Sequence, residues 1–367
     1  MIRRANWCHA ALFLLVCMVA MPEMASAEYP STSLPSGQQV ALAVDPSRAP
    51  RIAFMQNGTL THAYWNGKWT SAPIPGASQT QNDIDIAVDH WGRSHVAAAN
   101  GSQIQCFYRE GATWIAKPLT GTSVGGPYQI SLALRRDGDT VVPCIAYYDK
   151  STSYPSLKFA QYTNGAWSVT TVDSESGNAT GRSPSLVIDF TGHAHIAYFG
   201  GSSSFGKPPK LKYAHQVGNS WEVETVFPGS GIEISWNLEY RLCEIALNSS
   251  GQPCILYTIP PTGNSTVSSI MYSVKSAQVW SIFQAGTTLG ATSVSLGANA
   301  SGNRWLLKGG YVDNVDTGIK QIKASLISGP PHSTVFFHSH HGIFFGHFGR
   351  ESFNKRGVFG HFCCFLF

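Results

Sequence analysis

A unit of four short apolar runs recurs six times along this 367-residue chain, and no other feature of the sequence limits its fold as strongly. In each copy the first run leads through a turn, which carries Gly in most copies, into the second run. A third run follows, and in five copies a tryptophan marks the fourth. The copies recur at intervals of about 44 to 59 residues, the period of propeller blades.

The repeat predicts an all-β chain, namely a six-bladed β-propeller of four-stranded antiparallel blades over residues 28–330. A single blade cannot bury both of its faces, so blades must stack on one another. Runs rich in Val, Ile, Leu and Ala suit the inner strands, and the tryptophans are expected to pack blade against blade. We expect the blades to begin near residues 38, 83, 129, 184, 243 and 292.

Residues 331–367 differ from everything before them, because they hold 10 of the 19 phenylalanines and 6 of the 13 histidines without any apolar period. We expect this tail to lie outside the fold, as a frameshifted end would. A metal-binding tail is the alternative, since it is rich in imidazoles. The sixth copy lacks its tryptophan run. Either residues 28–36 complete that blade, or the C-terminus is abnormal and seven blades are possible.

The N-terminus has the pattern of a secretory signal peptide over residues 1–27. Arg3 and Arg4 precede an apolar run from Ala10 to Met21, and Ala25-Ser26-Ala27 forms a small-residue cleavage pattern. The apolar run is too short to span a bilayer comfortably, and no later stretch approaches the required length. We therefore expect a secreted, periplasmic or cell-surface protein with no transmembrane span after cleavage.

Charge excludes one class of partner. The formal net charge is only +4, and most of that excess lies in the two ends of the chain. A nucleic-acid-binding domain needs a clustered basic face, which this sequence lacks. We expect no nucleic-acid partner, no cofactor and no metal site in the repeat region.

The repeat pattern also carries a family resemblance. Its copies read Leu-Ala-x-Asp, a glycine turn, His-Ile-Ala-Tyr-x-Asp, Leu-Lys-Tyr-Ala and Asn-Gly-x-Trp. Over about residues 38–327 the chain resembles secreted bacterial propeller proteins of the sialidase-like superfamily, whose repeats carry Asp boxes (BNR repeats). That family acts through an arginine triad, a tyrosine paired with a glutamate, and an aspartate. Here the turns before Trp69, Trp167 and Trp221 keep only the turn residues and tryptophan of the box, so the resemblance implies the fold rather than the reaction.

Long loops indicate where a ligand would bind. In an up-and-down blade, the loops from strand 2 to 3 and from strand 4 to the next blade emerge at the same end, and these are the loops that grow here. Aromatic faces with carboxylates and arginines suit a glycan. The expected ligand-binding residues are Tyr148, Tyr154, Arg182, Trp236, Tyr240 and Arg241. The carboxylates that could serve catalysis are Glu175, Glu233, Glu239 and Asp149.

Three functions are compatible with this rim. We favour a carbohydrate-binding propeller without catalysis, because no residue set matches a catalytic signature. A glycoside hydrolase is the first alternative and would need two carboxylates across a cleft. The second alternative is an extracellular scaffold that binds a partner protein.

Other recurring polar residues are interpreted as architecture. Asp45, Asp89 and Asp189 end a first run and start a turn, where an Asp side chain bonds its own backbone. His193 and His195 share a strand face but lack a third metal ligand, so we expect them to be hydrogen-bonded residues.

One disulfide is expected in an oxidising compartment. Cys243 and Cys254 flank a predicted hairpin turn at nearly equal distances. Cysteines on paired strands can come close enough for a bond.

Overall fold

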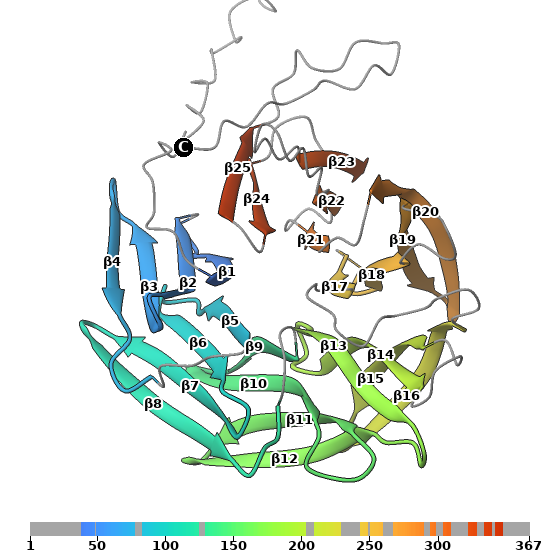
Figure 1. Ribbon diagram of the computed structural model, residues 1–367, viewed down its shortest axis with the longest axis horizontal. Coiled ribbons are helices and arrows are strands. Elements are labelled where there is room, and N and C mark those ends of the chain that lie inside the picture. Colours follow the sequence, from blue (N-terminus) through green and yellow to red (C-terminus); the bar gives the residue numbers. More distant parts are fainter. Residues whose placement is uncertain are drawn as a thin grey trace, which may run out of the picture. The chain divides into compact units, whose positions relative to one another are not determined.

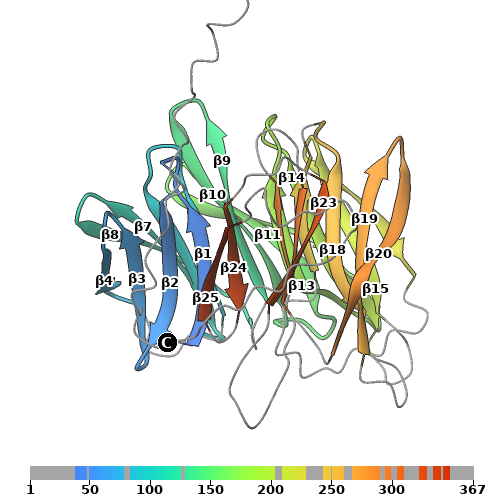
Figure 2. The ribbon, with the colours of Figure 1, turned by 90° about the horizontal axis from the view of Figure 1, so that it is seen from above.

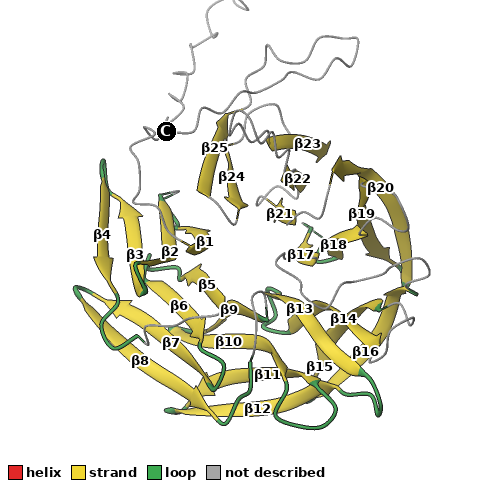
Figure 3. Ribbon diagram, viewed as in Figure 1, coloured by secondary structure: helices red, strands yellow, loops and turns green. Residues whose placement is uncertain are grey.

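The structure is a computed structural model. It describes residues 38–47, 49–77, 83–124, 129–202, 209–228, 243–248, 250–259 and 267–289, together with the backbone of five short strands between residues 294 and 347. Figure 3 shows that these residues form strands and loops. Among them, no helix is long and apolar enough to cross a membrane.

Five antiparallel sheets of four strands follow one another along the chain, and we call them blades 1 to 5. Blade 1 contains β1 (Gln38–Val44), β2 (Pro50–Gln56), β3 (Thr59–Trp65) and β4 (Trp69–Pro73). Blade 2 contains β5 (Asp83–Val88), β6 (Ser94–Ala99), β7 (Gln103–Glu110) and β8 (Thr113–Thr120). Blade 3 contains β9 (Ile130–Asp137), β10 (Thr140–Asp149), β11 (Ser156–Thr163) and β12 (Ala166–Asp173).

Blade 4 contains β13 (Ala179–Ile188), β14 (Ala194–Ser202), β15 (Lys210–Val217) and β16 (Ser220–Phe227). Blade 5 contains β17 (Cys243–Leu247), β18 (Pro253–Ile259), β19 (Val267–Ser276) and β20 (Val279–Leu289). The all-β class and the four-stranded antiparallel sheets are therefore confirmed.

The strands after blade 5 form smaller sheets. A three-stranded sheet contains β21 (Val294–Ala298), β22 (Arg304–Gly309) and β23 (Ile322–Ser328). A two-stranded sheet, β24 (Thr334–Ser339) with β25 (Gly342–His347), falls within the segment expected to be a tail. A sixth or seventh four-stranded blade remains a prediction.

The first strand of each blade lies innermost and contacts the first strand of the next (Figure 1). The second strands are the most deeply buried, as in β6, where all six residues are buried. The fourth strands are mostly exposed or half-buried, as in β16, where only Val226 is buried. In the view of Figure 2 the blade strands run between two ends. The short-turn end carries the turns between first and second strands, and the long-loop end carries the connections between second and third strands and between blades.

Tryptophans of the fourth strands join consecutive blades, as predicted. Trp114, Trp167, Trp221 and Trp280 each pack against a cluster of buried residues shared with the preceding blade. Trp167 Nε1 also donates a hydrogen bond of 3.2 Å to the carbonyl of Lys117 in blade 2. Each ring is only partly buried, so it stabilises the interface by less than the roughly 1.5 to 3 kcal/mol of a fully buried side chain.

The expected disulfide between Cys243 and Cys254 does not form. In the β17–β18 hairpin Cys243 lies opposite Tyr257, and Cys254 lies opposite Ala246. The two sulfurs therefore point to opposite faces of the sheet, because side chains alternate along a strand. Each is a buried thiol that donates to a backbone carbonyl: Cys243 to Ser183 at 3.2 Å and Cys254 to a turn residue at 3.6 Å.

Candidate functional site

The start of β13 positions a cluster of polar residues at the long-loop end of blades 3 and 4. Three register shifts interrupt its pairing with β14, and Gly181 has a φ of 106°. A Cβ at Gly181 would lie 2.7 Å from the Cα of Leu157 in blade 3, so only glycine permits this approach. The amide of Thr180 donates to the carbonyl of Pro155 at 2.9 Å. The irregular strand start thus lies directly on blade 3.

This crossing brings Arg182 onto Tyr148 at the end of β10. The Arg182 Cζ lies 5.2 Å from the centre of the tyrosine ring. Burial raises the pKa of Tyr148, and the nearby guanidinium partly offsets that rise. Only 2% of Tyr148 is exposed. Tyr148 therefore contacts the guanidinium of Arg182 and does not offer the open aromatic face that we expected.

Asp149 holds two loops together. Its carboxylate accepts hydrogen bonds from the amide of Ser123 at 3.0 Å, and from the amide and hydroxyl of Ser151 at 3.1 and 2.7 Å. Only 4% of the residue is exposed. These bonds explain its position without a catalytic role.

A lysine and two carboxylates lie beside this crossing. Lys212 Nζ lies 2.5 Å from Asp173 Oδ2 and 2.5 Å from Glu175 Oε1. The hydroxyl of Tyr198 donates to the same Asp173 oxygen at 2.6 Å. The Lys212 side chain is only 8% exposed, whereas that of Glu175 is 30% exposed. Glu175 is therefore the member of the cluster that solvent or a ligand can reach.

Charge pairing shifts the pKa values of Lys212 and Glu175. Burial lowers the pKa of Lys212, but its bonds to the two carboxylates outweigh this and raise the pKa overall. Burial raises the pKa of Glu175, yet the hydrogen bond and charge of Lys212 bring it below its usual value. Burial, with the charge of Asp173, raises the pKa of Tyr198 well above its usual value. At neutral pH the site presents an ionised glutamate.

An ionised Glu175 can accept hydrogen bonds from hydroxyl groups but is not suited to be a general acid, which needs a raised pKa. Asp173 and Glu175 also share one ammonium group. They are therefore not a pair of carboxylates facing each other across open space, as glycoside hydrolysis requires. Among the described residues, this cluster suits binding better than catalysis.

The remaining predicted residues divide into two groups. Tyr154 is 47% exposed, next to Pro155. Five lie outside the described residues: Glu233, Trp236, Glu239, Tyr240 and Arg241. Sequence reasoning missed Lys212, because the Leu-Lys pair recurs in blade 3 and was interpreted as repeat architecture.

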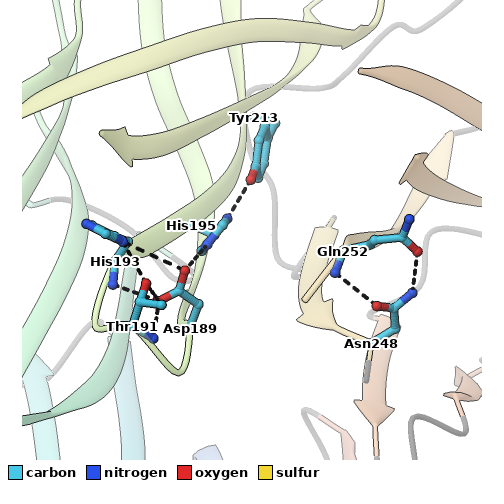
Figure 4. Close-up of polar contacts among 7 residues, drawn as sticks. All are labelled: Asp189, Thr191, His193, His195, Tyr213, Asn248 and Gln252. Carbon is cyan, nitrogen blue, oxygen red and sulfur yellow. Dashed lines mark hydrogen bonds and ion pairs between the residues drawn. The ribbon is translucent and has the colours of Figure 1, made fainter. Parts of the chain in front are cut away.

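The short-turn end has a recurring polar arrangement of its own, drawn for two blades in Figure 4. Asp189 Oδ1 accepts from the amides of Thr191 and His193 at 2.8 and 2.9 Å. Its Oδ2 accepts from His195 Nε2 at 3.3 Å, and His195 Nδ1 lies 2.5 Å from the hydroxyl of Tyr213. The interpretation of these residues as hydrogen-bonded architecture is confirmed.

The same backbone bonds recur at the other predicted aspartates. Asp45 Oδ1 accepts from the amide of Ala49 at 2.9 Å, and Asp89 Oδ1 accepts from that of Arg93 at 2.8 Å. Within the described parts of the chain, no group of three or more His, Cys, Asp or Glu side chains is placed to hold a metal ion.

Comparison with known proteins supports the fold alone. No family model matches the chain, and no curated protein matches it in sequence. An α-L-arabinanase from Penicillium chrysogenum, solved with arabinobiose, is similar at a TM-score of 0.50 and 9% identity, covering 81% of this chain and 98% of its own. The α-L-arabinofuranosidase Arb93A from Fusarium graminearum is similar at 0.52 and 10% identity, covering 80% and 93%. These likenesses support a β-propeller.

A fungal lectin from Aleuria aurantia, described as a six-bladed β-propeller with fucose recognition, is less similar. Its TM-score is 0.44 at 14% identity, with coverage of 80% of this chain and 97% of its own. Membership of the sialidase-like superfamily and a bacterial origin stay predictions.

Proposed function

We propose that this chain is a secreted, six-bladed propeller that binds carbohydrate at its long-loop end without catalysis. One observation carries the proposal: Glu175 is ionised and reachable, and it lies in the same short segment as Arg182. Tyr154 adds an exposed ring, because the neighbouring Pro155 is bonded to Thr180 in that segment. Carboxylate, guanidinium and aromatic ring are groups that hold sugar hydroxyls and the C–H faces of sugar rings.

The known chemistry of structural neighbours agrees with this class of ligand. Two of the proteins that are similar at a TM-score of 0.50 or above are named as an arabinanase and an arabinofuranosidase. Arabino-oligosaccharides are therefore the first ligands to test, followed by neutral and acidic glycans of other composition.

The test is binding of the full chain to an immobilised glycan array, followed by calorimetry with the best ligand. We expect Glu175→Gln and Arg182→Gln each to weaken binding about tenfold, equivalent to about 1.4 kcal/mol, because each removes a charge-assisted hydrogen bond. Glu222→Gln is the matched control, since Glu222 is 67% exposed and pairs with His215 on the same blade. If the chain binds no glycan on the array, or if all variants bind with equal affinity, the proposal is refuted.

A glycoside hydrolase is the second candidate, favoured by the fold likeness to an α-L-arabinanase and an α-L-arabinofuranosidase. Its catalytic carboxylates would be Glu233 and Glu239. Release of reducing sugar from arabinan, abolished by Glu233→Gln or Glu239→Gln and unaffected by Glu222→Gln, would replace the binding proposal with this one.

A further inference from the structure

Trp91 takes the place of a hydroxyl residue that recurs in three other hairpin turns of the repeat. Two positions after the turn Asp or Asn, blades 1, 4 and 5 have Ser47, Thr191 and Ser250. Ser47 Oγ donates to Asp45 at 2.6 Å, and Thr191 Oγ1 donates to Asp189 at 2.7 Å. Blade 2 has tryptophan at this position.

The tryptophan gives up that hydrogen bond and is 49% exposed. It also differs from the tryptophans of the fourth strands, which are packed between blades. The ring instead contacts Arg93 and His90 of the same turn. An exposed aromatic ring that its neighbours hold in place is a surface on which a ligand can pack.

The neighbours of Trp91 hold its ring in one orientation. Its amide donates to Asp89 Oδ1 at 3.0 Å. The ring centre of His90 lies 3.6 Å from that of Trp91, and the Arg93 Cζ lies 4.4 Å from the indole centroid. Arg93 is itself fixed, since its Nε donates to Asp89 Oδ2 at 2.7 Å. A pre-oriented ring loses little conformational freedom when a ligand binds.

The charges around the ring cancel. Arg93 is paired with Asp89. The Asp89 carboxylate accepts hydrogen bonds from His95 and Arg93, and these hold its pKa below the usual value despite burial. Burial also lowers the pKa of His95, which is therefore neutral at pH 7. The turn offers an aromatic surface, guanidinium donors and no net charge.

We propose that Trp91 and Arg93 form a contact site for a neutral oligosaccharide at the short-turn end of blade 2. The C–H face of a sugar packs on the indole, and its hydroxyls accept hydrogen bonds from the guanidinium. A protein partner would find a lone ring among polar neighbours, whereas binding hot spots of proteins are packed inside larger patches. This site shares only its ligand class with the site at Glu175, which lies at the other end of the blades.

Fluorine NMR tests the proposal on the full chain labelled with 5-fluorotryptophan. The resonance lost in Trp91→Thr identifies Trp91. Arabinohexaose, xylohexaose and cellohexaose are then titrated separately. We expect the Trp91 resonance to shift with at least one of them, in the wild type and equally in Glu175→Gln. No shift with any of the three overturns the proposal, whatever happens at Glu175.

Two controls separate binding from folding. Trp91→Thr introduces the residue found in blade 4, so its thermal midpoint should stay within about 5 °C of the wild type while affinity at this site falls at least tenfold. Phe190→Ser removes another exposed ring, 92% exposed, from the equivalent turn of blade 4 and should leave affinity unchanged. A midpoint for Trp91→Thr that falls by more than about 5 °C would mean that the ring is structural.

Discussion

The hairpin turns of blades 4 and 5 have the same backbone but different electrostatics (Figure 4). In blade 4, Asp189 Oδ1 binds the turn amides while Oδ2 faces His195. In blade 5, Asn248 Oδ1 binds the amides of Ser250 and Gln252 at 3.0 and 2.9 Å, and its amide group donates to the side chain of Gln252 at 2.8 Å. In both turns Oδ1 accepts hydrogen bonds from the turn amides. The second polar group interacts with a different side chain in each: Asp189 Oδ2 with His195, and the Asn248 amide with Gln252.

The residue six positions after the turn Asp or Asn differs according to whether the turn side chain is a carboxylate or an amide. It is arginine or histidine behind Asp45, Asp89 and Asp189, and it is Cys254 behind Asn248. Each turn carboxylate is paired with a donor at the residue six positions later, whereas the amide of Asn248 has a cysteine at that position. The recurring aspartates are thus structural, and their recurrence carries no catalytic meaning.

Removing the whole side chain should produce the largest difference between the two turns. We expect Asp189→Ala to lower the free energy of unfolding by about 3 kcal/mol, because two turn amides and His195 lose an ionised acceptor. Asn248→Ala should cost about 1.5 kcal/mol, since a neutral acceptor is lost. Urea denaturation measures both. Equal costs would contradict the distinct role of the second carboxylate oxygen.

Exchanging the chemistry of the turns should have a smaller effect. Asp189→Asn keeps the turn bonds but places an amide beside His195, and should cost about 1 kcal/mol. Adding His195→Cys, as in blade 5, should cost less than the sum of the two single changes, with a coupling energy of about 0.5 to 1 kcal/mol. A double-mutant cycle measures this, and strict additivity would show that the pair is not coupled.

The two turns should also respond differently to acid. Burial lowers the pKa of His195, despite its bond to Asp189, so the unfolded chain binds protons more readily. The stability contributed by neutral His195 is therefore present above about pH 6.5 and is lost as the pH falls below that value towards the folded pKa. We expect His195→Gln to reduce the loss of stability between pH 7.5 and 5.

A second acid response lies lower. Burial raises the pKa of Asp189, but its hydrogen bonds lower it to about 2, so its contribution is lost as the pH falls from about 3.8 towards 2. The equivalent residue of blade 5 is an amide, and Asn248→Ala should leave the pH profile of stability unchanged. A flattened profile in that variant would argue against the assignment.

The smallest effect is expected at the edge of blade 5. Gln252 Nε2 donates to Ser276 Oγ at 3.2 Å in an exposed position. Ser276→Ala should change the free energy of unfolding by less than about 0.5 kcal/mol, because water replaces the bond. A larger cost would mean that the neutral turn depends on its neighbouring strand.

The periodic part of the fold could be predicted from sequence, because apolar runs, turn aspartates and tryptophans each act locally. The first strand of blade 4 could not. It was expected near residue 184, but β13 begins at Ala179, since Gly181 and Ser183 adopt positive φ and let a loop-like segment pair with β14. The error in the cysteine pairing has a similar origin: the turn of blade 5 ends at Gln252, which shifts the register.

Loop length could predict that Glu175 and Arg182 lie at the long-loop end, and ligand binding at this end stays a prediction. The chemistry around Glu175 could not be predicted. The contact of Lys212 with Asp173 joins residues distant in sequence, and no local pattern encodes it.

The tryptophan contacts make each interface between blades directional, like the joints of a head-to-tail polymer. Every blade from 2 to 5 gives a ring to its predecessor, and Trp69 with Ile52 and Phe54 presents the same kind of surface on blade 1. A heterologous interface of this kind does not by itself limit how many units can be added. No single interface therefore encodes the number of blades: closure of the array must set it, and duplication of one blade would preserve every joint.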